Sequence, residues 1–299
     1  MSIHLVLVLA LFIGISKGQL RIGFYAETCP EAESIVRAVV QDAILSKANT
    51  AAALLRLHFH DCFVEGCDGS ILIENGPNAE RHAFGHQGVV GFEVIEKAKA
   101  ELETVCRGVV SCADIVALAA RDAIALANGP AYQVPTGRRD GRVSNVSLAA
   151  EMPDVSDSIQ QLKAKFLQKG LTEKDLVLLS AGGGADPAIN PAFLPELKAR
   201  CPQNGDVNSR LAIDRGSEQT FDKHILQNIK DGFAVLESDA RLNDDETTKS
   251  IIDSYFGFLN PLFGPSFEAD FVESIVKMGQ IGVKTGFRGG IRHVCAAFN

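Results

Sequence analysis

Seven cysteines behind an apolar N-terminal run most strongly limit how this 299-residue chain can fold. Residues 5–15 are apolar and precede the small residues Ser16 and Gly18, a pattern typical of a secretory signal peptide and too short for a membrane span. We expect residues 1–18 to be removed and the mature chain to begin at Gln19; the alternative is a buried N-terminal helix. Because an exported chain meets an oxidising compartment, the cysteines are predicted to form disulfides, with one thiol left over.

The charge and length of the chain disfavour several classes of protein. Its formal net charge is −8, which argues against nucleic acid as a partner because the phosphates would be repelled. No second long apolar stretch follows the first, so a soluble product without a membrane partner is expected. The length suits one large domain, or two lobes that share a core. Nothing indicates an oligomer interface, so we expect a monomer.

Apolar residues recur with the spacing of amphipathic helices along most of the chain. The run from Cys112 to Ala127 is apolar around most of its circumference, which predicts a core helix. Alternating strand patterns are nearly absent and no linker or repeat divides the sequence, so we predict a single, mainly α-helical unit. The predicted helices cover residues 30–47, 51–60, 92–105, 112–127, 172–179, 251–259 and 267–278.

Arg56 and His60 are four residues apart in one predicted helix, which places both on the same face. A neutral imidazole there can take the proton of a peroxide and return it to the departing oxygen. The guanidinium can stabilise the negative charge that develops as the O–O bond breaks. For these two residues alone, an ordinary pair on a solvated helix face is the alternative.

The loop that follows is dense in oxygen donors. Its carboxylates, backbone carbonyls and hydroxyl suit Ca²⁺ better than zinc, although the spacing is not that of an EF-hand. Cys62 and Cys67 flank the loop closely enough to close a small ring. Zinc or copper chelation by His58 and His60 is disfavoured, because residues two apart on a helix point in different directions. The candidate calcium ligands are Asp61, Val64, Gly66, Asp68 and Ser70.

The segment from Arg56 to Ser70 resembles the distal haem segment of class III (plant secretory) peroxidases. The resemblance extends over nearly the whole mature chain through further motifs, among them Val110-Ser111-Cys112-Ala113-Asp114, Gly137-Arg138-Arg139-Asp140-Gly141 and Phe221-Asp222. It implies a mainly-α plant-type haem peroxidase fold, with two helical lobes around a haem cleft. It also implies a secreted enzyme with haem b and two Ca²⁺ ions that oxidises small phenolic donors with hydrogen peroxide. Its location would be the extracellular space or cell wall, with the vacuole as an alternative.

The resemblance also implies roles for individual residues. Arg56 and His60 are the implied distal acid–base pair. His86 stands where many members carry an Asn that sets the tautomer of the distal histidine, and Phe84 and Pro153 lie at the implied entrance for aromatic substrates. The first calcium is implied at Asp61, Val64, Gly66, Asp68 and Ser70, with Glu80 in support, and the second at Asp214, Ser217 (in place of the usual Thr), Thr220 and Asp222. The implied disulfides are Cys29–Cys106, Cys62–Cys67 and Cys112–Cys295.

The chain departs from the family pattern after Leu179-Ser180. The family has its axial haem histidine just after this turn, followed by a Thr, a helix and a Cys, whereas here a glycine run leads straight to Asp186-Pro187. This implies a segment deleted near residues 181–186, with part of the proximal lobe missing, the second calcium site impaired and no haem axial ligand identified. Cys201 would be unpaired, and Asp239 would lack the imidazole it should orient. From pattern alone, the glycine run is an ordinary surface loop.

Three accounts of the chain therefore stay open. It is a haem peroxidase, a catalytically inactive calcium-stabilised secreted protein, or a splice or gene-model variant that lacks the proximal segment. His224 and His293 are interpreted as surface or packed residues, and nothing around Cys201 supports a thiolate axial ligand. His86 is expected to make the distal pair sensitive to acid, because a second imidazole titrates in the same range. Asn145-Val146-Ser147 matches a glycosylation acceptor.

Overall fold

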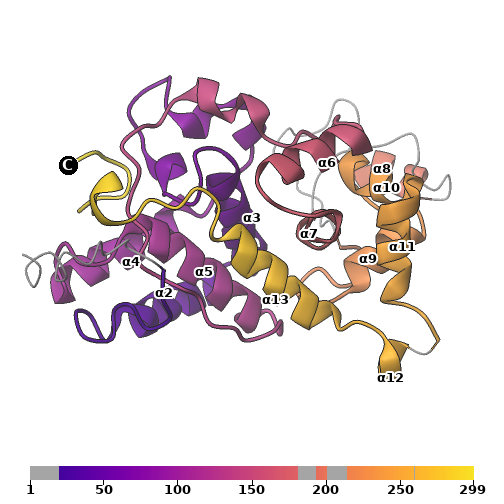
Figure 1. Cartoon of the computed structure of the whole chain (residues 1–299), viewed down its shortest axis with the longest axis horizontal. Coiled ribbons are helices and arrows are strands. Elements are labelled where there is room, and N and C mark those ends of the chain that lie inside the picture. Colours follow the sequence, from indigo (N-terminus) through magenta and orange to yellow (C-terminus); the bar gives the residue numbers. More distant parts are fainter. Residues whose placement is uncertain (1–19, 181–192, 201–213, 259) are drawn as a thin grey trace, which may run out of the picture.

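The computed structural model describes residues 20–180, 193–200, 214–258 and 260–299 (Figure 1). Within these residues the chain is mainly α-helical, which confirms that part of the predicted fold class. The β pairing there is limited to three isolated bridges, Arg21–Thr136, Arg139–Lys284 and Asp140–Gly290. The predicted leader at residues 1–18, the glycine-rich stretch near residues 181–186 and Cys201 lie outside the described residues.

A first group of helices surrounds α5 (Cys112–Leu126), the core helix that the sequence predicts. Nearly all side chains of α5 are buried, because Ala and aliphatic residues occupy most of its circumference. Ser111 caps the helix by accepting a hydrogen bond from the backbone N–H of Asp114 at 3.1 Å. Apolar side chains of this group form one hydrophobic cluster. The helices around α5 are α2 Ala32–Ser46, α3 Thr50–Phe63 and α4 Phe92–Val105.

A second group of helices encloses another hydrophobic cluster. In this group α7 (Glu173–Leu179) begins as predicted, because Thr172 and Asp175 form a reciprocal capping box. It packs against α13 (Phe267–Met278), α6 (Ile159–Gln168) and α11 (Glu246–Ser254). The other helices are α8 Leu194–Arg200, α9 His224–Lys230, α10 Glu237–Asp244 and α12 Asn260–Phe263, and short 3-10 helices span Ser70–Leu72, Glu80–His82, Phe84–His86, Val146–Glu151 and Gly286–Arg288.

The helix predicted over residues 251–259 is wrong in both bounds. Its place is taken by α11, which begins earlier because Asp245 accepts hydrogen bonds from the backbone N–H groups of Thr247 and Thr248, both at 3.1 Å. The helix ends at Ser254, before Gly257. The sequence prediction extended the helix too far because Phe258 is apolar and fits the helical spacing. In the structure, however, its side chain is 97% exposed.

Helix α13 crosses the middle of the molecule, between the two groups (Figure 1). Arg138 joins its end to the first group through a buried ion pair. The guanidinium lies 2.8 Å from Asp114 Oδ1 and donates from Nη2 to the carbonyl of Gly279 at 2.6 Å. Asp114 also accepts a hydrogen bond from the hydroxyl of Tyr25 at 2.6 Å. Because every member of this network is partnered, the charges can stay buried between the two groups.

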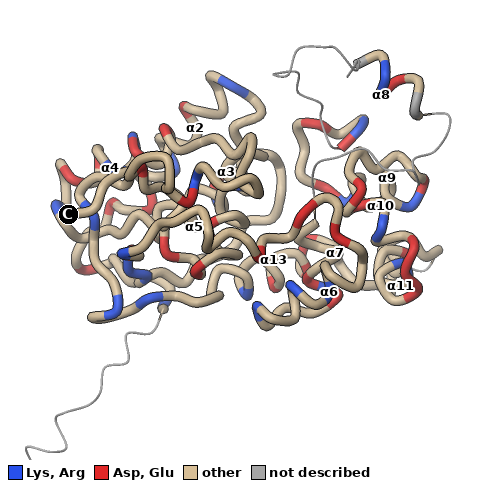
Figure 2. Tube along the Cα trace, turned by 90° about the horizontal axis from the view of Figure 1, so that it is seen from above, with Lys and Arg blue, Asp and Glu red and all other residues tan. Residues whose placement is uncertain are grey.

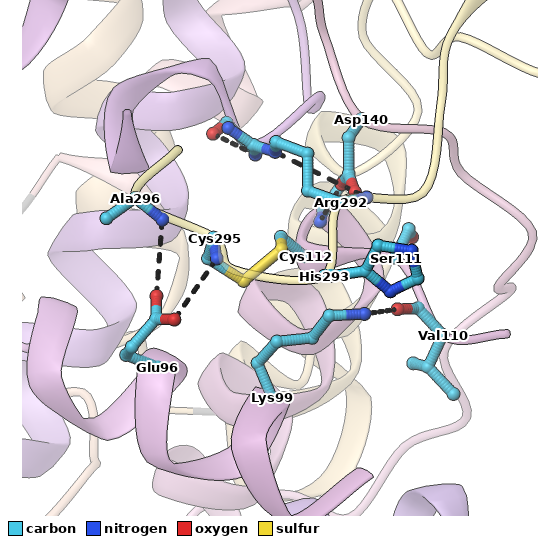
Figure 3. Close-up of a disulfide and its surroundings, with 12 residues drawn as sticks. Glu96, Lys99, Val110, Ser111, Cys112, Asp140, Arg292, His293, Cys295 and Ala296 are labelled. Carbon is cyan, nitrogen blue, oxygen red and sulfur yellow. Dashed lines mark hydrogen bonds and ion pairs between the residues drawn. A yellow bond between two sulfur atoms is a disulfide. The ribbon is translucent and has the colours of Figure 1, made fainter. Parts of the chain in front are cut away.

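The three disulfides of the structure match those that the family resemblance implies. They join Cys29 to Cys106, Cys62 to Cys67 and Cys112 to Cys295. Figure 3 shows the last of them, which holds the C-terminal segment against α4 and α5. There Glu96 accepts hydrogen bonds from the backbone N–H groups of Cys295 and Ala296, both at 3.2 Å. The end of the chain is therefore fixed to the first group.

Charged residues of both signs are interspersed along the two groups of helices (Figure 2). Some form partly exposed pairs one helical turn apart, such as Arg241 with Glu237 at 2.6 Å and Lys249 with Asp253 at 2.8 Å. Such pairs add little stability, so the buried clusters and disulfides carry the fold. None of the described helices is long and apolar enough to cross a membrane.

Candidate active site and calcium sites

Helix α3 brings Arg56 and His60 together on one face, as their spacing predicts. Arg56 Nε donates a hydrogen bond to His60 Nε2 at 3.1 Å, and its Nη2 donates to the carbonyl of Gln87 at 3.1 Å. His60 is buried, whereas the pair alone could equally have faced solvent. The two groups that would handle a proton and a developing negative charge therefore lie in direct contact.

His86 sets the tautomer of His60. The two Nδ1 atoms are 2.9 Å apart, so one carries a proton and the other accepts it. Because Arg56 donates to His60 Nε2, the proton of His60 must lie on Nδ1, and His86 must accept it. The remaining proton of His86 then lies on Nε2, which is 3.7 Å from Glu80 Oε1. This arrangement leaves Nε2 of His60 as the proton acceptor of the site.

Burial keeps both imidazoles neutral near pH 7. It lowers the pKa of His60 well below the usual value, with further contributions from Arg56 and His86. Burial and the Arg56 charge lower the pKa of His86 to about 4. A neutral His60 can accept a proton, which a general base requires.

The first predicted calcium set contains buried oxygen atoms that the chain leaves unsatisfied. Within the described residues, Asp61 Oδ1, Ser70 Oγ and both carboxylate oxygens of Glu80 have no hydrogen-bond partner. Burial and the neighbouring Asp68 raise the pKa of Asp61 to about 8, and burial and Asp61 raise that of Glu80 to about 9. A hard divalent cation would coordinate these unpaired oxygens and neutralise the repulsion between the carboxylates, so these residues fit Ca²⁺.

The backbone of the same loop is constrained by its surroundings. Gly66 has a φ of +101°, and a Cβ there would lie 2.6 Å from the Cα of Gly282, so only glycine fits.

Two lysines that sequence reasoning missed also contact residues of the first predicted calcium set. Lys169 Nζ donates to the Val64 carbonyl at 2.8 Å, and Lys284 pairs with Asp68. In the part of the chain that is described, no three His, Cys, Asp or Glu side chains form a metal-holding group, so backbone and hydroxyl oxygens would have to complete the coordination.

In the second predicted calcium set, the side chains of Asp214, Ser217 and Asp222 are hydrogen-bonded to other groups of the protein. Asp214 Oδ1 accepts hydrogen bonds from His224 and Asn228, and Ser217 donates to Asp222. Thr220 is exposed. Sequence reasoning missed Asn228 and interpreted His224 as a surface or packed residue. Their four-residue spacing was the signal that could have indicated a shared partner.

The two residues predicted to lie at the substrate entrance belong to adjoining segments. Phe84 is 74% exposed and Pro153 is half-buried. Their segments adjoin, since a Cβ on Gly85 would lie 3.4 Å from that of Met152. An exposed aromatic ring beside a proline could contact a flat aromatic ligand.

The described histidines outside the distal site all lie against other groups of the protein. His224 is bound to Asp214, and His293 to Glu103, at 2.8 Å in each case. His82 lies 3.0 Å from Glu74 at the surface. His58 is buried beside Cys62, and burial, reinforced by the charge of Arg138, lowers its pKa to about 3. The distal side chains fit haem, whereas each of these other histidines lies against another group of the protein. Asp239 lies buried on α10.

Known proteins resemble the chain along nearly its whole length. A family model described as Peroxidase matches residues 36–257. Peroxidase 43 of Arabidopsis thaliana is 66% identical, with 96% of this chain and 95% of the relative covered. Peroxidase 13 of the same plant is 55% identical over 100% of this chain and 99% of the relative, and Peroxidase N1 of Nicotiana tabacum is 46% identical over 98% and 95%.

Proposed function

The chain belongs to the class III family of plant peroxidases, and on this premise we propose that it oxidises small phenolic donors with hydrogen peroxide. The family implies haem and calcium as cofactors. The observation that carries the proposal is the chain of hydrogen bonds from Arg56 through His60 to His86, which leaves His60 Nε2 without a proton. Haem supplies the redox chemistry when it is bound.

The side chains of the distal face act on the proton and the charge of the peroxide. His60 Nε2 takes a proton from a peroxide held beside it and returns it to the departing oxygen. Arg56 stabilises the negative charge that grows on that oxygen. His86 holds His60 in the tautomer that leaves Nε2 without a proton. Phe84 and Pro153 are the proposed contacts of the phenolic donor.

A finer proposal is that the segment with the proximal histidine is missing near residues 181–186, together with part of the proximal lobe. The match with Peroxidase 13 supports it, because that match runs over 318 positions whereas this chain has 299 residues. At least 19 positions (318 − 299) therefore have no residue from this chain. The bound states of His224 and His293 support it too. These observations are the grounds for a second candidate function, that of a catalytically inactive, calcium-stabilised secreted protein.

The remaining proposals concern the environment of the protein. We propose removal of residues 1–18, secretion to the extracellular space or cell wall (or to the vacuole), and a monomeric state. Of the two calcium sites of the family, the second is impaired here. Asn145 is exposed and its Oδ1 accepts a hydrogen bond from the hydroxyl of Ser147 at 2.9 Å, which supports glycosylation at this residue. A mass loss after glycosidase treatment tests that modification.

Reconstitution with haem separates the two candidate functions. The purified protein is refolded with haem and calcium, and the Soret band and the peroxide-dependent oxidation of a phenol are recorded. A shifted Soret band with turnover is expected of the enzyme. A spectrum equal to that of free haem, with no turnover, leaves the inactive protein. Sequencing the transcript across the codons for Ser180 to Asp186 tests the splice or gene-model account.

A further inference from the structure

The second set of predicted calcium ligands is already bonded within the chain. Asp214 Oδ1 accepts hydrogen bonds from His224 Nδ1 at 2.8 Å and from Asn228 Nδ2 at 2.7 Å. Ser217 Oγ donates to Asp222 Oδ2 at 2.6 Å, and Asp222 Oδ1 accepts from the backbone N–H of His224 at 2.7 Å. These carboxylate oxygens of Asp214 and Asp222, which could coordinate a cation, therefore already accept hydrogen bonds from N–H and O–H groups of the protein.

The donors belong to one face of α9 and meet a turn shaped for them. His224 and Asn228 are four residues apart, so both reach back from the helix to the turn before it. Asn228 Nδ2 also donates to the carbonyl of Arg215 at 3.1 Å. Gly216 has a φ of +93°, and a Cβ at this position would lie 3.3 Å from His224 Cε1. The imidazole thus packs against the turn as well as bonding to it.

Three members of the first set show the opposite arrangement, although Asp68 pairs with Lys284 and the Val64 carbonyl accepts a hydrogen bond from Lys169. Asp61 Oδ1, Ser70 Oγ and both Glu80 oxygens are buried and, among the described residues, have no hydrogen-bond partner. Burying such groups without a partner is unfavourable, so a ligand is needed there. In the second set the side chains of Asp214, Ser217 and Asp222 all have partners, so no comparable need exists.

We propose that this chain binds a single calcium ion, at the first set, and that His224 and Asn228 replace the second ion by holding α9 to the turn at Asp214. Calcium takes about six to eight oxygen ligands and cannot coordinate an N–H group. Binding at the second set through Asp214 Oδ1 would therefore have to compete with the bonds from both His224 and Asn228. The proposal deepens the impaired second site put forward above, but it involves neither haem nor turnover.

Counting bound calcium tests the proposal directly. The purified protein is stripped with a chelator, re-equilibrated with calcium and desalted, and the metal is measured by mass spectrometry and by calorimetric titration. One ion per chain is expected. Two ions per chain with affinities within tenfold of each other would overturn the proposal. A failure of haem binding or turnover leaves this count unchanged, so the two proposals fail independently.

Melting curves with calcium and with chelator test the replacement itself. His224→Ala is expected to lower Tm by the same amount in both conditions, because the bond it removes does not depend on calcium. His293→Ala is the matched control, since it removes a histidine–carboxylate pair of the same length far from α9 in the chain, and a much smaller change is expected. Ser70→Ala should abolish most of the calcium-dependent rise in Tm. A His224→Ala effect that vanishes in saturating calcium would refute the replacement.

Discussion

Removing the disulfide between Cys112 and Cys295 should destabilise the protein mainly through its unfolded state. The bridge closes a loop with a sequence separation of 183, and neither of the other two bridges lies inside that loop. Chain entropy then predicts a loss of about 5 kcal/mol for Cys112→Ala with Cys295→Ala. Total stabilities are only about 5–15 kcal/mol, so this is a large fraction.

The native contacts around this bridge should survive its removal. Glu96 still binds the backbone of Cys295 and Ala296, and Arg292 donates from its backbone N–H to Asp140 at 2.8 Å (Figure 3). The variant is therefore expected to keep its native circular dichroism while its unfolding free energy falls. Urea unfolding in saturating calcium measures that fall.

The bridge between Cys62 and Cys67 is the matched control for loop length. Its sequence separation is 5, for which the same relation predicts about 2 kcal/mol. Saturating calcium keeps the loop around it ordered in both proteins. If the long-loop variant loses no more stability than the Cys62→Ala, Cys67→Ala variant, the entropic account is refuted.

Three further predictions concern the distal site. If the reconstituted protein turns over, His60→Leu should lower the rate with peroxide by about 10²–10⁴-fold, while His82→Asn at the surface should leave it unchanged; equal rates would exclude His60 as the base. His86 has a folded pKa of about 4, below that of the unfolded chain, so its contribution to stability is complete above about pH 6.5 and is lost toward pH 4. His86→Asn should therefore flatten the acid side of the stability profile by about 1.4 kcal/mol per pH unit, and an unchanged slope would contradict this. Without calcium, Asp61 and Glu80 have folded pKa values of about 8 and 9, so their contribution is complete at low pH and is lost as pH rises through those values. Chelated protein should melt at a higher temperature at pH 6 than at pH 8, and calcium should raise Tm more at pH 8; the reverse order would show that these carboxylates do not repel each other.

The sequence predicts a helix well where neighbouring residues, such as a capping pair, determine where the helix begins and ends. α4 matches its predicted bounds, and Thr172 with Asp175 begins α7 as their capping pattern indicates. α11 was mispredicted because hydrophobicity alone does not show whether Phe258 is buried. Apolar spacing predicts a helix, but only packing decides where the helix must end.

The partners of the site residues were harder to predict from the sequence. Lys284 reaches Asp68 from 216 residues away, and Lys169 reaches Val64 from 105 residues away. Such pairs have no sequence pattern, because they depend on how distant helices dock. His86 was identified by its place in the family pattern, whereas its contact with Glu80 came from the fold.

The Cys-flanked loop and the Arg56–His60 face are properties of neighbouring residues, so the sequence by itself determined both. It also determined that no histidine lies between Ser180 and Asp186, because that is a matter of which residues are present. Only the tertiary structure decided that His60 is neutral, that Asp61 Oδ1 lacks a hydrogen-bond partner and that Asp214 Oδ1 has two. Protonation and hydrogen-bond satisfaction depend on burial and on groups brought from elsewhere in the chain, and a linear sequence does not contain those distances.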